Sequence, residues 1–160
     1  MAATALAPAA IVNPNIDMNG FLAVSQAAAR HRENRRVTEA EFIRLSAEPG
    51  TVILDARSRA MFDLLHVKGA VHLNFSDITT ESLARLLPDP SQRILIYCNN
   101  NFANAPRAFA AKMPSASLNL STFITLFGYG YTNVYELGPW LDVQSTRIEL
   151  VSTPAAERRN

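Results

Sequence analysis

Short runs of branched apolar residues alternate along the chain with longer segments in which apolar residues recur every three or four positions. The runs predict buried strands at residues 51–54, 71–73, 93–98 and 133–137. The longer segments predict helices at residues 17–36, 38–48, 58–65, 80–87, 104–112 and 118–127. This alternation indicates parallel strands joined by right-handed crossovers. The expected fold is α/β, a three-layer doubly wound domain with a central, mainly parallel sheet and an N-terminal helical extension.

Three of the predicted helices carry specific signals. Thr38 and Glu41 have the spacing of a capping box, and Pro49 and Gly50 end the helix that they begin. In the 118–127 helix the apolar positions follow the i, i+3, i+4, i+7 pattern, at Leu120, Phe123, Ile124 and Phe127. The first helix has a shorter apolar stripe and is expected to pack outside the main domain; the stripe consists of Phe21, Val24 and Ala28.

A chain of 160 residues suits one domain. We expect a flexible tail rich in Ala and Pro at residues 1–16, the helical extension at 17–36, the domain at 37–150 and a second flexible tail at 151–160. The first ten residues, MAATALAPAA, lack the basic start and long apolar core of an intact secretory signal. They match the small-residue remnant of a cleaved one, which favours an exported, periplasmic protein over a cytoplasmic one.

Composition argues for an ordinary globular protein, with 48% hydrophobic residues, 18% charged residues and a formal net charge of +1. The basic run at residues 30–36 is interrupted by Glu33 and contains no aromatic residue, so it predicts a solvated helix end and no nucleic-acid partner. No apolar stretch reaches about 18 residues, and we expect no membrane span. With one cysteine the chain forms no internal disulfide and has no thiolate set for a metal, so no cofactor is expected.

That single cysteine, Cys98, ends the apolar strand RILIYC and is followed by three asparagines. A thiol is nucleophilic as the thiolate, which needs positive potential around it at neutral pH. A tight loop leading into a helix supplies such potential through converging backbone N–H groups. Asparagine tolerates the unusual backbone conformations that such a loop needs. We expect the amides of Asn99, Asn100, Asn101, Phe102 and Ala103 to form this cradle. The alternative is that Cys98 is a small buried apolar residue.

The chain resembles the rhodanese homology domain in five segments that occur in the family's order. They are VTEAEF, VILDARS, FDLLHVKGAVHLN, ILIYC and GYTNVYELGPW, and together they span about residues 37–143. The resemblance implies a sulfurtransferase or sulfane-sulfur carrier in which Cys98 becomes a persulfide and passes the outer sulfur to a nucleophilic acceptor. It implies as partners a small sulfur-donor anion or persulfide and a thiol or cyanide acceptor. A protein partner remains open.

The resemblance also suggests roles for residues around the loop. Asp55 and Arg57 resemble the paired charges beneath it and are expected to hold the strand end. His66 resembles a semi-conserved position and is expected to be a packing or supporting residue. Many loops of the family have Gly and Arg where this chain has Asn101 and Ala103. Loss of that arginine removes a clamp for an oxyanion such as thiosulfate, and the candidates to replace it are Arg59 and Arg107.

Other departures and alternatives follow from the same residues. The segment KMPSASLNLST is an apparent insertion that is expected to cover the site mouth or to bind a partner. One alternative function is a catalytically inactive or redox-sensing binding module. Phosphatase chemistry is disfavoured because it needs an arginine six positions after the cysteine, where this chain has Asn104.

Overall fold

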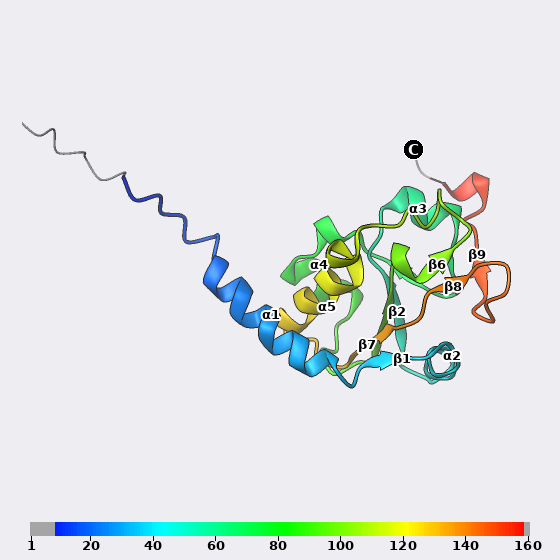
Figure 1. Ribbon diagram of the computed structural model, residues 1–160, viewed down its shortest axis with the longest axis horizontal. Helices are drawn as coiled ribbons and strands as arrows, with labels where there is room; N and C mark the ends of the chain where they lie inside the picture. The colour runs from blue at the N-terminus through cyan, green and yellow to red at the C-terminus, as the bar shows by residue number, and fades with distance from the viewer. Residues whose placement is uncertain (1–8, 159–160) are drawn as a thin grey trace, which may run out of the picture.

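A five-stranded parallel sheet forms the centre of the molecule in a computed structural model that describes residues 9–158 (Figure 1). Its strand order is β1-β7-β5-β2-β4. The strands are β1 (Arg36–Val37), β2 (Val52–Asp55), β4 (Val71–His72), β5 (Ile94–Tyr97) and β7 (Val134–Leu137). Every pair in this sheet is parallel, and Asp55 at the end of β2 lies opposite Tyr97 at the end of β5. The predicted α/β class is therefore confirmed, and Cys98 follows the central strand at the carboxyl edge of the sheet.

Helices cover both faces of this sheet, as Figure 1 shows. They are α1 (Met18–Arg32), α2 (Glu39–Ser46), α3 (Arg59–Leu64), α4 (Thr80–Leu86) and α5 (Leu118–Gly128). Side chains of α1, α4 and α5 form one apolar core with Leu54, Ile94 and Ile96 of the sheet. On the other face α2 and the loops pack against Ile53 and Leu95. Alternate strand residues thus enter different cores, which is the pattern of a strand buried on both sides.

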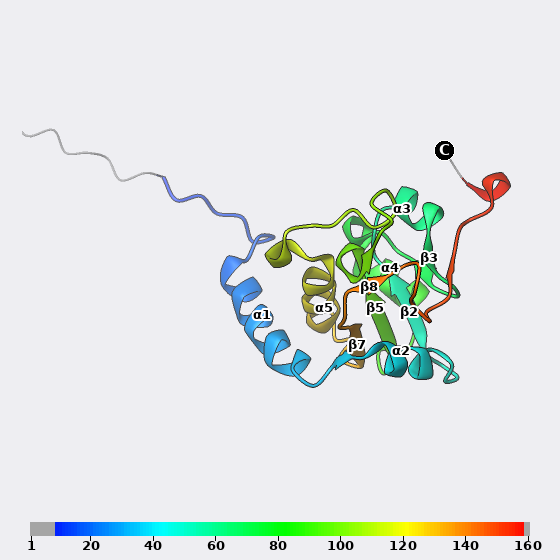
Figure 2. The same ribbon diagram turned by 45° about the vertical axis from the view of Figure 1, so that its right-hand side comes forward.

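Helix α1 packs along α5 in both views (Figures 1 and 2). Ala28 is fully buried, and the ring of His31 lies 5.3 Å from that of Phe127. The guanidinium of Arg32 pairs with the carboxylate of Glu136 in β7, with Nη2 2.7 Å from Oε1. The predicted apolar stripe is wrong at Phe21, which is 57% exposed because the first half of the helix extends past α5.

The predicted helix at 104–112 is absent. The chain instead forms a two-residue strand, β6 (Phe102–Ala103), which pairs with β8 (Leu141–Asp142), and then irregular turns. Asn104 has a φ of 65°, a left-handed conformation that ends regular structure, and Pro106 lacks an N–H to donate. A single turn remains, in which the N–H of Phe109 donates to the carbonyl of Ala105 at 2.8 Å.

Helix α5 lies where predicted, and three of its four predicted apolar positions enter the core, with Phe123 buried and Ile124 and Phe127 half-buried against it. Its other buried residues, which the apolar spacing did not indicate, are Asn119, Thr122 and Leu126. Of the two polar ones, Asn119 reaches the Cys98 loop, where it donates to Oδ1 of Asn101.

The domain also continues past the predicted boundary at residue 150. Strand β9 (Leu150–Val151) pairs antiparallel with β3 (His66–Val67), and the N–H of Thr153 donates to the carbonyl of Asp63 at 3.0 Å. These backbone bonds attach the start of the predicted 151–160 tail to the domain, and a turn of 3₁₀ helix follows at Ala155–Glu157. Residues 9–16 form neither helix nor strand. The remainder of both predicted tails, 1–8 and 159–160, lies outside the described residues.

Candidate functional site

A buried ion pair lies at the carboxyl end of the central strands. Asp55 is 0% and Arg57 1% exposed, and Nη2 of Arg57 lies 2.6 Å from Oδ2 of Asp55. Arg57 also donates to the carbonyls of Ala108 at 2.6 Å and Leu65 at 2.8 Å. It therefore joins the end of β2 to the segment that follows the Cys98 loop. A buried pair is retained when its remaining donors find acceptors, as they do here.

Tyr97 extends this network. Its hydroxyl donates to Oδ2 of Asp55 and accepts from the N–H of Val67 at 3.0 Å. Burial, reinforced by the neighbouring carboxylate of Asp55, raises the pKa of Tyr97 well above its ordinary value. The phenol thus remains a hydrogen-bond donor to Asp55. These three side chains fix the base of the loop and leave no titratable group of their own facing the sulfur.

Cys98 is 1% exposed, and its sulfur has two hydrogen-bonding neighbours among the described residues. Sγ lies 3.4 Å from the backbone nitrogen of Asn100 and 3.5 Å from Oγ of Ser117. The chain makes one 3₁₀ turn at Asn99–Asn101 and then continues into β6. Of the five amides expected to face the sulfur, that of Asn100 does so through a described hydrogen bond, whereas that of Asn101 donates to the carbonyl of Cys98. The local cradle is therefore the 3₁₀ turn that Cys98 caps, with Asn100 as the amide hydrogen-bonded to Sγ, and it is completed by a hydroxyl from far along the chain.

The three asparagines do not adopt the left-handed conformation that motivated their interpretation. Among residues 9–158, Asn104 is the one non-glycine residue with positive φ. The side chains of the three instead hold the loop through hydrogen bonds to its surroundings. Asn99 donates to Sδ of Met61 at 3.1 Å, and Asn100 exchanges two hydrogen bonds with the backbone of Lys112, at 2.9 and 2.8 Å.

Asn101 has the most partners of the three. Its Oδ1 accepts from the N–H of Cys98 at 2.9 Å and from Nδ2 of Asn119 at 3.0 Å. Its Nδ2 donates to the carbonyls of Leu137 at 2.9 Å and Pro139 at 3.0 Å. One buried amide thus joins the cysteine, α5 and the end of β7. This use of both ends of the amide gives Asn101 a structural role that a glycine, which has no side chain, could not fill.

Sequence reasoning missed Ser117 and Asn119. Ser117 precedes α5, but its side chain makes no capping bond to that helix and lies against Sγ of Cys98. Asn119 is buried, and its Oδ1 has no hydrogen-bond partner among the described residues, as is also true of Oγ1 of Thr122. The available signal was their place in the apparent insertion expected to cover the site.

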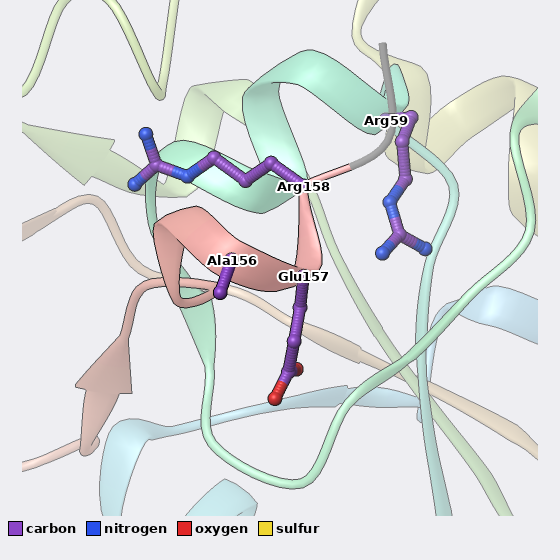
Figure 3. A pocket seen from close by; sticks show the side chains of 4 residues that line it. All are labelled: Arg59, Ala156, Glu157 and Arg158. Carbon is purple, nitrogen blue, oxygen red and sulfur yellow. The ribbon is translucent and has the colours of Figure 1, made fainter.

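The other predicted site residues lie apart from the sulfur. Arg59 forms an ion pair with Asp63 at 3.0 Å and borders an open cavity of about 760 Å³ whose other lining residues are Ala156, Glu157 and Arg158. In Figure 3 the two guanidinium groups of this cavity point in different directions. Arg107 is exposed and borders a separate apolar cavity. Neither Arg59 nor Arg107 makes a described hydrogen bond to residues 98–103. Neither therefore supplies a guanidinium at the loop in place of the arginine that Ala103 lacks.

His66 is a packing residue in this arrangement. Its ring stacks on that of Phe62 with centroids 3.7 Å apart, and Nδ1 donates to the carbonyl of Phe62 at 2.6 Å. Within residues 9–158, no three side chains of the types that bind metals gather at one place. In the same part of the chain, no helix combines the length and apolar character needed to cross a bilayer.

Comparison with known proteins supports the same architecture. Residues 38–138 match the family model described as rhodanese-like domain. A thiosulfate sulfurtransferase from Pseudomonas aeruginosa is 18% identical with a TM-score of 0.55, over 84% of this chain and 23% of that one. The Alr3790 protein from Anabaena is 18% identical with a TM-score of 0.51, over 72% and 80% of the two chains. The BH2092 protein from Bacillus halodurans is 18% identical with a TM-score of 0.50, over 84% and 90%. Among curated proteins, no sequence matches this chain.

Proposed function

The chain belongs to the rhodanese-like domain family, and on this basis we propose that it is a sulfurtransferase or sulfane-sulfur carrier that forms a persulfide on Cys98. The observation that carries the proposal is the position of Sγ, at the end of the central strand between the amide of Asn100 and the hydroxyl of Ser117. Both groups donate hydrogen bonds to an anionic sulfur. The Cys98 thiolate and the Cys98 persulfide are both anions, and such donors stabilise both.

Helix α5 adds to this environment. It has eleven residues, and Ser117 stands immediately before its first turn. The N–H groups of a first helical turn carry a partial positive charge that favours an anion nearby. In this chain the helix beside the sulfur is α5, and the segment directly after the loop, where a helix was expected, is irregular. A hydroxyl, an amide and a helix terminus are therefore the groups that favour an anionic sulfur at Cys98, and none of them is a cationic clamp for an oxyanion.

The proposed reaction has two steps. The Cys98 thiolate attacks the sulfane sulfur of a donor, and the donor's sulfur–sulfur bond breaks with its electron pair leaving on an anion. That anion is sulfite for thiosulfate and a thiolate for a low-molecular persulfide. A deprotonated thiol or cyanide then attacks the outer sulfur of the Cys98 persulfide, and the Cys98 thiolate is regenerated. Neither step needs a general base held beside the loop.

The polar groups at the sulfur favour a persulfide donor over thiosulfate. A neutral hydroxyl and an amide suffice for a singly charged persulfide sulfur, whereas the thiosulfate dianion gains most from a guanidinium, which binds two of its oxygens at once. Arg59 and Arg107 do not supply that contact in the described geometry. We therefore expect faster loading from a low-molecular persulfide than from thiosulfate.

Intact-mass spectrometry tests this proposal. The purified protein is incubated with glutathione persulfide or thiosulfate, and a mass increase of one sulfur atom is expected in the wild type and not in Cys98→Ser. Ser117→Ala is expected to load at least about tenfold more slowly, because one hydrogen bond to a charged sulfur, worth about 1.5 kcal/mol or more, is lost. Ser115→Ala is the matched control, since the Ser115 side chain is exposed and makes no described hydrogen bond. Absence of labelling by either donor would refute the proposal.

A second candidate function is a catalytically inactive or redox-sensing binding module, and the 1% exposure of Cys98 favours its inactive form, because a buried sulfur is closed to donors. A sensor needs a thiol that an oxidant reaches, but it needs no transfer to an acceptor. The two functions differ in the fate of a loaded sulfur. Transfer of the label to cyanide or a thiol, followed by return of the original mass, supports the enzyme. Oxidation of Cys98 by hydrogen peroxide without sulfur loading supports the module.

A further inference from the structure

The segment that ends at Ser117 is exposed, although its last side chain contacts a buried sulfur. We call residues 110–117 the strap. Each residue from 111 to 116 is exposed, including Met113 at 67%. The final residue, Ser117, lies against Sγ of Cys98 at 3.5 Å. The strap therefore reaches the sulfur through its last residue without entering either apolar core, and apolar burial contributes little to holding it there.

Two hydrogen bonds join the middle of the strap to the Cys98 loop. Nδ2 of Asn100 donates to the carbonyl of Lys112 at 2.9 Å, and the N–H of Lys112 donates to Oδ1 of Asn100 at 2.8 Å. Both bonds are exposed to solvent, in contrast to the buried bonds of Asn101. Within the described residues, the strap's other backbone bonds are two local turns, from Ala116 to Met113 and from Ser117 to Pro114, and one bond at its end, from the N–H of Leu120 in α5 to the carbonyl of Ser117.

We propose that Asn100 is a positioning residue that latches the strap over Cys98, and that release of this latch admits the sulfur donor. The proposal rests on the function proposed above, since it explains how a donor reaches a sulfur that is 1% exposed. In-line attack requires the donor sulfur to touch Sγ. The backbone around Sγ is a central strand on one side and α5 on another. Of the elements next to Sγ, β5 and α5 contribute to the apolar cores and the strap does not, and local opening begins at such weakly buried segments.

The latch is separable from the chemistry of the sulfur. Its bonds use the side chain of Asn100, whereas Sγ contacts the backbone nitrogen of the same residue. Asn100→Ala therefore removes the latch and keeps the amide at the sulfur. Buried Asn101, with partners in three other parts of the fold, holds the loop itself in place when the strap opens.

Alkylation of Cys98 by iodoacetamide in the folded protein measures the opening. Wild-type Cys98 is expected to react slowly, with a rate that rises only shallowly with urea below the unfolding transition, because a local opening exposes little surface. Asn100→Ala is expected to react about tenfold faster, because two exposed hydrogen bonds are lost. The factor should be the same at each pH between about 6 and 9, since the latch has no ionisable group. Asn100→Gln retains the donor and the acceptor of the side-chain amide. Its alkylation rate should therefore lie between the rates of wild type and Asn100→Ala.

Asn104→Gly is the matched control. It removes one hydrogen bond from the same loop, that of Asn104 to Asp142 at 2.6 Å, and glycine accepts the positive φ at this position. Its alkylation rate should stay within about twofold of wild type. An unchanged rate in Asn100→Ala overturns the proposal. So does a urea dependence as steep as that of global unfolding. The two proposals can fail separately. If Asn100→Ala is alkylated faster but no donor loads sulfur onto the wild type, the latch proposal stands and the sulfurtransferase proposal is refuted.

Discussion

Replacement of Tyr97 by Phe isolates the contribution of the hydroxyl at the centre of the buried network. The hydroxyl donates to the carboxylate of Asp55 and accepts from the N–H of Val67 at 3.0 Å, and the side chain is 1% exposed. Phe keeps the ring and its packing. The variant therefore removes one charge-assisted hydrogen bond and leaves one buried backbone donor without a partner.

The magnitude follows from these two losses. A hydrogen bond to a charged group contributes about 1.5–3 kcal/mol, and a buried donor without a partner costs about 1–3 kcal/mol. Asp55 keeps its bonds to Arg57, which limits the first loss. We therefore expect Tyr97→Phe to lower the free energy of unfolding by about 3 kcal/mol. This is a large fraction of the stability usual for a domain of this size.

Tyr131→Phe is the matched control for this prediction. Tyr131 is also buried, and its hydroxyl makes one neutral hydrogen bond, to the carbonyl of Leu87 at 2.9 Å. Its loss should cost about 1 kcal/mol. Urea denaturation at neutral pH measures the free energy of unfolding of each variant. Equal losses in the two variants, within about 0.5 kcal/mol, would refute the reasoning that the carboxylate and the Val67 amide distinguish Tyr97.

Three further predictions concern the same region. The pKa of Tyr97 is raised in the folded state, so above about pH 10 the unfolded chain loses this proton before the folded protein does. The free energy of unfolding should therefore fall with rising pH in that range, by up to about 1.4 kcal/mol per pH unit, and less steeply in Tyr97→Phe. Arg57→Met should cost about 3–5 kcal/mol in urea denaturation by leaving buried Asp55 unpaired, and adding Asp55→Asn should recover part of it. Asn101→Asp places an oxygen against the carbonyls of Leu137 and Pro139, and a loss of about 2 kcal/mol or more is expected by thermal unfolding. A loss below about 0.5 kcal/mol in either variant would contradict these assignments.

The sequence supplied reliable information where a pattern is local. The apolar runs of β2 and β5 need no partner to be recognised, and the Thr38–Glu41 capping box is present in the structure. The end of β2 was also informative, because a polar residue after a buried strand lies at the sheet edge in any parallel α/β fold. These features depend on residues within a few positions of one another.

In the loop after Cys98, local sequence patterns were not enough to predict the role of the side chains. The sequence placed a thiol at a strand end and three asparagines after it, and the inference from their conformational tolerance was wrong. Their side chains bind Met61, Lys112 and Leu137, which lie 38, 12 and 36 residues away in the chain. An amide side chain has the same intrinsic preferences whichever partner it finds. Its role is therefore decided by what the fold brings to it.

By itself the sequence determined the alternation of strands and helices, the parallel sheet and the position of its one cysteine at the edge of that sheet. The tertiary structure decided which groups surround the sulfur, since Ser117 reaches it from 19 positions along the chain, and residues 104–112 form irregular turns after β6 in place of the predicted helix. Periodicity records which residues prefer burial, because that preference belongs to each side chain. Contacts between distant segments depend on the packing of the whole chain, and no single stretch of sequence specifies them.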